Sequence, residues 1–101
     1  MTLYIAALIL ELHLPQCHSL KEKRAIIKPI LQKAQHRYKM SLTEVDYQEL
    51  WQRALLASTT VSSSAKQVEE VFNSLERFVW SNPEIEVVSV ERKWFSEEIG
   101  S

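Results

Sequence analysis

The sequence contains a single glycine, Gly100, next to the last of its 101 residues. Glycine-built phosphate loops, such as the P-loop and the Rossmann fingerprint, place several glycines within one turn, so both are excluded. Cys17 is the single cysteine, which rules out an intrachain disulfide and a cysteine-clustered zinc site. These absences remove whole classes of nucleotide-binding and zinc proteins and point to no reaction in their place.

Long apolar runs are also missing. The run at the N-terminus spans residues 3–10 and ends at Glu11, whereas a membrane-spanning helix needs about 20 apolar residues. No Lys or Arg precedes this run and no small-residue cleavage site follows it, so it does not resemble a signal peptide. We expect a buried strand here, and a cytoplasmic protein without membrane contact.

What is present is an ordinary globular mixture. Hydrophobic residues make up 46% of the chain and charged residues 25%, which is enough apolar surface for one core. No linker, repeat or low-complexity block divides the sequence. We therefore expect one domain over residues 1–101, with residues 96–101 as a frayed tail.

Two helices are predicted from capping signals followed by apolar stripes. Ser19 with Glu22, and Ser64 with Gln67, have the spacing of a capping box, in which each side chain satisfies a free backbone N–H group. Pro29 lies inside the first predicted helix and removes one of its hydrogen bonds. A local kink is the expectation, and a break into two helices is the alternative.

Strands are predicted where apolar residues recur with a period of two. Leucines at positions 8, 10, 12 and 14 alternate with Ile9, Glu11 and His13, and Pro15 ends this segment. Residues 40–45 and 50–62, joined by a short turn, predict a hairpin. In chain order we predict a strand over 3–14, a helix over 20–38, strands over 40–45 and 50–62, a helix from 64 to the stop at 82–83, and a strand over 84–95.

This βαββαβ order predicts an α+β fold of the ferredoxin-like type. Right-handed crossovers turn the pattern into a four-stranded antiparallel sheet with strand order 4-1-3-2 and both helices on one face. The leucines of the first strand are assigned to the covered face, together with Ala54, Leu56, Ser58 and Thr60 of the third strand. Because both faces of the third strand carry apolar residues, the opposite assignment of that strand stays open.

The uncovered face of this sheet is predicted to carry an apolar patch. With the assignment above, the patch consists of Ile5, Ile9, Trp51 and Leu55. Exposed patches of this kind usually mark interfaces. We interpret it as a contact for a homodimer or another partner, and the alternative is a small patch covered by the C-terminal tail.

The net charge of −1 conceals a strong asymmetry. Residues 21–39 hold seven basic residues and one acidic residue, a net charge of +6, and the rest of the chain therefore carries −7. Such a segment could contact RNA phosphates. The alternative is a solvated helix whose lysines lie over the edge of the core, and the sheet lacks the aromatic motif of an RNA-recognition domain. The predicted nucleic-acid-binding residues are Lys21, Lys23, Arg24, Lys28, Lys33, Arg37 and Arg53.

Catalytic chemistry is not indicated by the remaining residues. His13, Cys17 and His18 form the one cluster of soft ligands, and their spacing fits no standard zinc pattern. Adjacent side chains in an extended loop point apart, so Cys17 and His18 are unsuited to act as nucleophile and base. We expect a protein that is not an enzyme and that holds no metal or cofactor.

The segments LHLPQCHSLKEKR, EVDYQELWQRALL, VEEVFNSLERFV and EVVSVERKW resemble the bacterial YlxP-like family, the domain of unknown function family 503. The resemblance covers nearly the whole chain and implies a small ferredoxin-like protein. Genes of this family often lie beside those for translation initiation and ribosome maturation factors, which implies an association with ribosomes or RNA. The motif residues carried over are Ser19, Leu20, Lys21, Glu22, Lys23, Arg24, Trp51, Gln52 and Arg53.

Two other ferredoxin-like families are excluded by the missing glycines. Acylphosphatase needs a glycine-framed phosphate loop, and ligand-binding domains of the ACT type usually have a glycine-bearing turn after the first strand. The sequence has Pro15-Gln-Cys-His18 at that turn. We therefore predict a binding module that associates with the ribosome or ribosomal RNA, and the alternative is a homodimeric module for a protein or small ligand that uses the uncovered sheet face.

Overall fold

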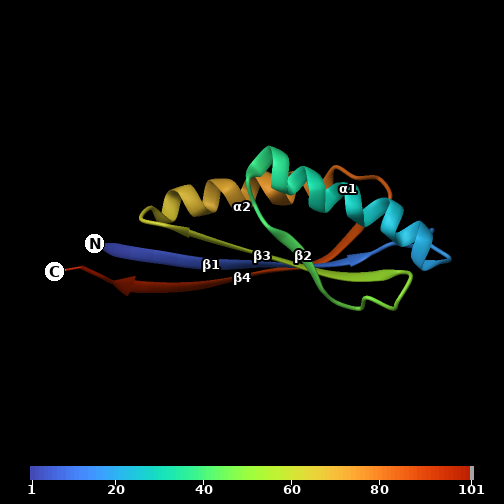
Figure 1. Cartoon of the computed structure of the whole chain (residues 1–101), viewed down its shortest axis with the longest axis horizontal. Coiled ribbons are helices and arrows are strands. Elements are labelled where there is room, and N and C mark those ends of the chain that lie inside the picture. Colours follow the sequence, from blue (N-terminus) through green and yellow to red (C-terminus); the bar gives the residue numbers. More distant parts are fainter. Residues whose placement is uncertain (101) are drawn as a thin grey trace.

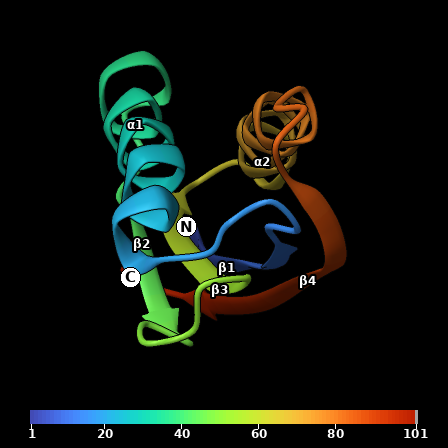
Figure 2. The same ribbon diagram turned by 90° about the vertical axis from the view of Figure 1, so that its right-hand side faces the viewer.

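The fold is a four-stranded sheet covered on one side by two helices. The computed structural model describes residues 1–100. The elements follow the order β1 (Thr2–His13), α1 (Leu20–Tyr38), β2 (Leu42–Asp46), β3 (Arg53–Ser62), α2 (Ala65–Trp80) and β4 (Glu86–Glu98). The strands pair antiparallel in the order β2-β3-β1-β4, and α1 and α2 lie on the same side of them (Figures 1 and 2). The predicted ferredoxin-like topology is confirmed.

Both helices begin at the predicted caps. The hydroxyl of Ser19 accepts the backbone N–H of Glu22 at 3.1 Å, and the hydroxyl of Ser64 accepts that of Gln67 at 3.2 Å. The Glu22 carboxylate in turn accepts the backbone N–H of His18 at 2.9 Å, one residue earlier than a standard capping box. A cap of this kind stabilises a helix by about 1 kcal/mol.

Pro29 does not split the first helix. α1 runs without interruption from residue 20 to residue 38, so the two-helix alternative is wrong. Pro29 and Ala25 are both exposed, and water can therefore serve the Ala25 carbonyl group that loses its donor. The helix ends at Lys39, whose φ of 56° lies in the left-handed region.

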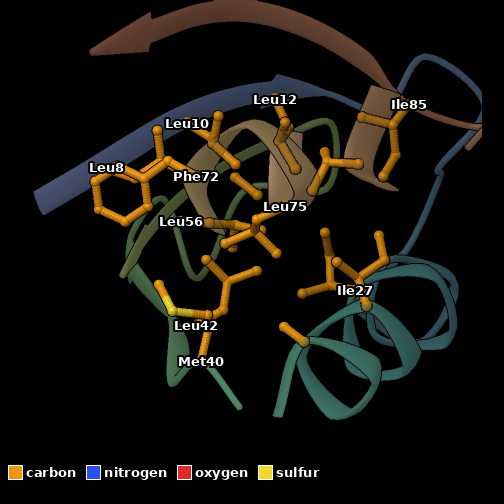
Figure 3. Packing of buried hydrophobic residues seen from close by; sticks show 14 of the residues in the cluster. Leu8, Leu10, Leu12, Ile27, Met40, Leu42, Leu56, Phe72, Leu75 and Ile85 are labelled. Carbon is orange, nitrogen blue, oxygen red and sulfur yellow. The ribbon is translucent and has the colours of Figure 1, made fainter. Parts of the chain in front are cut away.

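The core lies between the helices and one face of the sheet. Leu8, Leu10 and Leu12 of β1 point toward Phe72 and Leu75 of α2 (Figure 3). In β3, Ala54, Leu56 and Ser58 are buried on the same face, as the alternation predicted. Because a one-residue change of register would turn every one of these side chains to the other face, the burial fixes the pairing of the strands.

The C-terminal segment is longer and better ordered than the sequence suggested. β4 continues to Glu98, which pairs with Thr2, and the backbone N–H of Ile99 donates to the carbonyl oxygen of Met1 at 2.8 Å. The prediction of a frayed tail over residues 96–101 is therefore wrong for residues 96–99. Because β1 already begins at Thr2, its backbone N–H and C=O groups are available to pair with β4 as far as Glu98.

The sheet face turned away from the helices, here called the open face, carries no helix (Figure 2). Ile5, Ala7, Ile9, Glu11 and His13 of β1 point to it, because Ala6, Leu8, Leu10 and Leu12 are buried on the other side. Among the described residues, neither helix is long and apolar enough to cross a membrane.

Candidate nucleic-acid interface

The basic residues of α1 divide between its two sides. Lys21, Arg24 and Lys28, here called the edge group, are exposed, and helical geometry gathers them on one side of the helix. Arg24 and Lys28 also line a groove of about 240 Å³ between α1 and β2. The remaining lining residues of the groove are Leu20, Lys23, Ile27, Leu31, Glu44 and Gln48.

Two further cations of α1 face the second helix. Lys33 lines a hollow with Phe78 and the turn that follows α2, and Arg37 lines another of about 400 Å³. The second hollow also contains Arg77 of α2 and the hydroxyl-bearing residues Ser74 and Ser81. Lys33, Arg37 and Arg77 are here called the cleft group. Arg37 and Arg77 place positive charge beside the hydroxyl groups of one hollow, and Lys33 lines the neighbouring one.

The cations of the sheet and those of the helices differ in whether they form ion pairs. The cations of the sheet are all paired: Arg53 with Glu11 at 3.2 Å, Lys93 with Glu91 at 3.5 Å, and Arg92 with Glu76. Across residues 1–100, by contrast, no ion pair involves the edge group, the cleft group or Lys39. The helical layer thus presents positive side chains that no carboxylate of the described residues pairs with.

Lys23 does not belong to this surface, and its prediction as a nucleic-acid contact is wrong. Its side chain is 2% exposed, and its Nζ atom lies 2.7 Å from Oε2 of Glu44 and donates to the carbonyl oxygen of Tyr47 at 2.7 Å. The residue lies on the stripe of α1 that faces the sheet, beside Ile27. A buried ammonium group is tolerated because it is paired with a carboxylate.

Arg53 is separated from the basic helix by the thickness of the sheet. It pairs with His13 in the β1–β3 register and points to the open face, where its guanidinium group meets Glu11. The same group lies 4.0 Å from the centre of the Tyr47 ring, a cation–π contact. Since its charge is already engaged on the opposite face, Arg53 does not join the edge group.

The residues of the predicted apolar patch do not all lie together. β3 begins at Arg53, so Trp51 precedes the strand and lines a shallow hollow of about 440 Å³ with Leu50. Ile5 lies eight residues from His13, the β1 partner of Arg53, a separation of about 27 Å along the strand. Ile5 and Trp51 therefore lie at opposite ends of the sheet and cannot form one patch, although Ile9 and Leu55 lie between them on the open face.

The soft-ligand cluster is dispersed. His13 Nδ1 lies 3.0 Å from Oε2 of Glu86, whereas Cys17 is buried and His18 is exposed. Burial raises the pKa of the Cys17 thiol, and the negative charge of Glu22 adds to this. Residues 1–100 contain no group of three side chains placed to hold a metal ion.

Sequence reasoning missed Arg77, which lies in the second helix and far from the basic segment. The charge sum over residues 21–39 could not include it, because its proximity to Arg37 is created by the packing of α2 on α1. Tyr38 and Phe78 join the two helices at this point through a tilted contact of their rings, whose centres are 5.7 Å apart.

Comparison with known proteins identifies the family of this chain and a similar protein. The model of the family described as "Protein of unknown function (DUF503)" matches residues 5–92. A stretch of 77 residues, 76% of the chain, is 42% identical to a Bacillus subtilis (strain 168) protein described as "Uncharacterized protein YlxP", and covers 84% of that protein. The family match over residues 5–92 spans both helices and most of the sheet.

Proposed function

Since the chain belongs to the DUF503 family of proteins of unknown function, we propose its role from the surface of its helical layer. The protein is a non-enzymatic binding module that associates with RNA in the ribosome, in the cytoplasm, through the cations of α1. Its first contacts are the phosphates of the RNA backbone, which attract unpaired Lys and Arg side chains.

The observation that carries this proposal is the contrast between paired and unpaired cations. An Arg or Lys that already has a carboxylate partner gains little from a phosphate, because it must give up the first contact. Among residues 1–100, Lys21, Arg24 and Lys28 have no such partner, and neither do Lys33 and Arg37. The net charge of −1 does not oppose binding, because the acidic residues lie mostly outside α1.

The groove beside the edge group adds a second element. Leu20, Ile27 and Leu31 give it an apolar wall, and Arg24 and Lys28 stand at its rim. A single-stranded nucleotide needs both a charge for its phosphate and an apolar surface for its base. The groove therefore favours a looped or single-stranded RNA segment over a regular duplex.

The test is co-sedimentation of the purified chain with ribosomal particles at two salt concentrations. The variant reverses the edge group, with Lys21→Glu, Arg24→Glu and Lys28→Glu introduced together. We expect salt-sensitive binding by the wild type and loss of binding by the variant. Unchanged binding of the variant at low salt would overturn the proposal, as would binding that does not weaken with salt.

A matched control comes from α2. Lys66 is exposed, lies on the same layer and has no ion pair among residues 1–100. Lys66→Glu makes the same change of charge as Lys28→Glu, but away from α1. It is expected to keep most of the binding, whereas Lys28→Glu alone is expected to weaken it several-fold.

A further inference from the structure

Three exposed apolar side chains of the open face are neighbours across three strands. Ile5 of β1 pairs with Val61 of β3 on one side and with Phe95 of β4 on the other. Their exposed fractions are 37%, 59% and 62%. Leu3 and Ala7, two positions before and after Ile5 on β1, point to the same face. This apolar row lies at the end of the sheet opposite Trp51.

At this end of the sheet, β1 and β4 extend beyond β3. The β1–β3 ladder stops where Tyr4 pairs with Ser62, but the β1–β4 ladder continues to the pairs Leu3–Glu97 and Thr2–Glu98. The molecule is accordingly 54 Å long and 22 by 19 Å across, with a radius of gyration of 14.8 Å, against about 13 Å expected for this length. A two-stranded ribbon is only marginally stable in water by itself, so this projecting end would gain from a covering layer (Figure 1).

The charges beside the row are arranged symmetrically about Phe95. Lys93 precedes it by two positions and Glu97 follows it by two, and both point to the open face because they pair with Ala7 and Leu3. A two-fold axis through Phe95 would therefore bring Lys93 against Glu97 of a second copy, and Glu97 against Lys93. To make this contact Lys93 exchanges its 3.5 Å pair with Glu91, which is exposed and therefore contributes little stability.

We propose that a second copy of this chain covers the apolar row, with the two open faces packed against each other about an axis near Phe95. The two sheets then form a sandwich with roughly aligned strands, as two twisted sheets commonly do. The same patch serves both copies, which is the requirement of a closed two-fold dimer. This inference goes beyond the proposed RNA contact and does not depend on it.

The size of the overlap indicates how tight the dimer is. Positions 91–99 of β4 and the matching parts of β1 and β3 cover roughly 27 by 15 Å. That footprint is about 400 Å² for each copy and about 800 Å² for both, which is below a standard specific interface and within the range of weak, transient contacts. We therefore expect a weak dimer that forms between high micromolar and millimolar concentration and dissociates on dilution. Both α1 surfaces face outward in it, so dimerisation would double the number of RNA-binding surfaces.

The experiment is sedimentation equilibrium of the full chain across a range of concentrations, with a charge-swap cycle. Lys93→Glu alone and Glu97→Lys alone each place like charges together twice in the dimer and are expected to weaken dimerisation by about tenfold or more. The double variant restores opposite charges at both contacts and is expected to recover most of the wild-type affinity. Such a recovery cannot come from a general loss of folding.

Phe95→Ser gives an independent arm, with Trp80→Ser as its control. Trp80 is as exposed as Phe95, at 61%, but lies on α2. The Phe95 variant is expected to be monomeric and the Trp80 variant to dimerise like the wild type.

A monomeric wild type at millimolar concentration would overturn the proposal. A Phe95 variant that still dimerises, or a double charge variant that dimerises no better than the single ones, would do the same. Ribosome co-sedimentation by monomeric Phe95→Ser would leave the proposed function standing, so the two proposals fail separately.

Discussion

The Nζ atom of Lys23 in α1 lies 2.7 Å from Oε2 of Glu44 in β2, and this contact joins the basic helix to one of the two edge strands of the sheet. The same ammonium group donates a hydrogen bond to the carbonyl oxygen of Tyr47, in the turn that follows β2. Tyr47 has a φ of 63°, in the left-handed region. The most basic segment of the chain therefore uses Lys23 within the fold and leaves Lys21 and Lys28 exposed.

Lys23→Ala is expected to destabilise the fold by about 3 kcal/mol, because it leaves the Glu44 carboxylate half-enclosed without a partner. Lys21→Ala, a truncation of an exposed neighbour, is expected to change stability by less than about 0.5 kcal/mol. Urea denaturation of both variants measures the difference. Equal effects would show that Lys23 is not the structural residue described above. A Lys23→Met/Glu44→Leu double variant, which removes both charges, is expected to recover part of the loss.

Ser58 offers the opposite case, a buried polar group whose removal should help. Its side chain is 2% exposed, and its hydroxyl finds no hydrogen-bond partner among the described residues. It stands in β3 between Leu8 and Leu42 of the neighbouring strands. Ser58→Ala is expected to leave stability unchanged or to raise it by about 1 kcal/mol. A measured loss of more than 1 kcal/mol in thermal or urea denaturation would contradict this.

Lys39 ends α1 with left-handed backbone angles, φ 56° and ψ 31°. Glycine adopts these angles without the steric penalty of a side chain. Lys39→Gly is therefore expected to stabilise the protein by about 0.5–1 kcal/mol, seen as a rise in the midpoint of denaturation. Lys39→Ala, which keeps the Cβ atom, is the control and should show no such gain. A glycine variant no more stable than the alanine variant would disprove this account of the cap.

The Cys17 thiol has a raised pKa, and the sign of its effect on stability follows from that. The folded protein keeps the thiol proton at a pH where the unfolded chain has begun to lose it. The free energy of unfolding should therefore fall as the pH rises through and above the ordinary range of thiols. A thiol-specific reagent at pH 8 is expected to react far more slowly with the native protein than with the urea-unfolded chain. Equally fast labelling of both would contradict the burial of Cys17.

Local sequence signals were sufficient for most of the fold. Capping at Ser19 and Ser64 and the alternation of leucines in β1 are properties of neighbouring residues, and six elements in this order leave few topologies. Local signals gave the wrong prediction where a residue distant in the sequence determines the environment of a side chain. The charge pattern predicts Lys23 to be a surface residue, because Glu44, which neutralises it, is 21 positions away in the sequence.

The same limit applies to the sheet surface. The sequence suggested that Trp51 continues β3, but the strand begins at Arg53, which pairs with His13. Val61 and Phe95 were not grouped with Ile5, because their proximity depends on the register of three strands. That register fixes which apolar residues gather on the open face, and no pattern within a single segment contains it.

If the exposed cations of α1 hold RNA, they set how steeply the affinity for RNA falls as the salt concentration rises. Affinity for a fluorescent single-stranded RNA is measured at a series of salt concentrations, for the wild type and for a variant with Lys21→Gln, Arg24→Gln and Lys28→Gln. A logarithmic plot has a slope of about −0.7 for each phosphate contact, so removing three contacts should make the slope shallower by about 2. Equal slopes for the two proteins, or no binding by the wild type at low salt, would contradict the account.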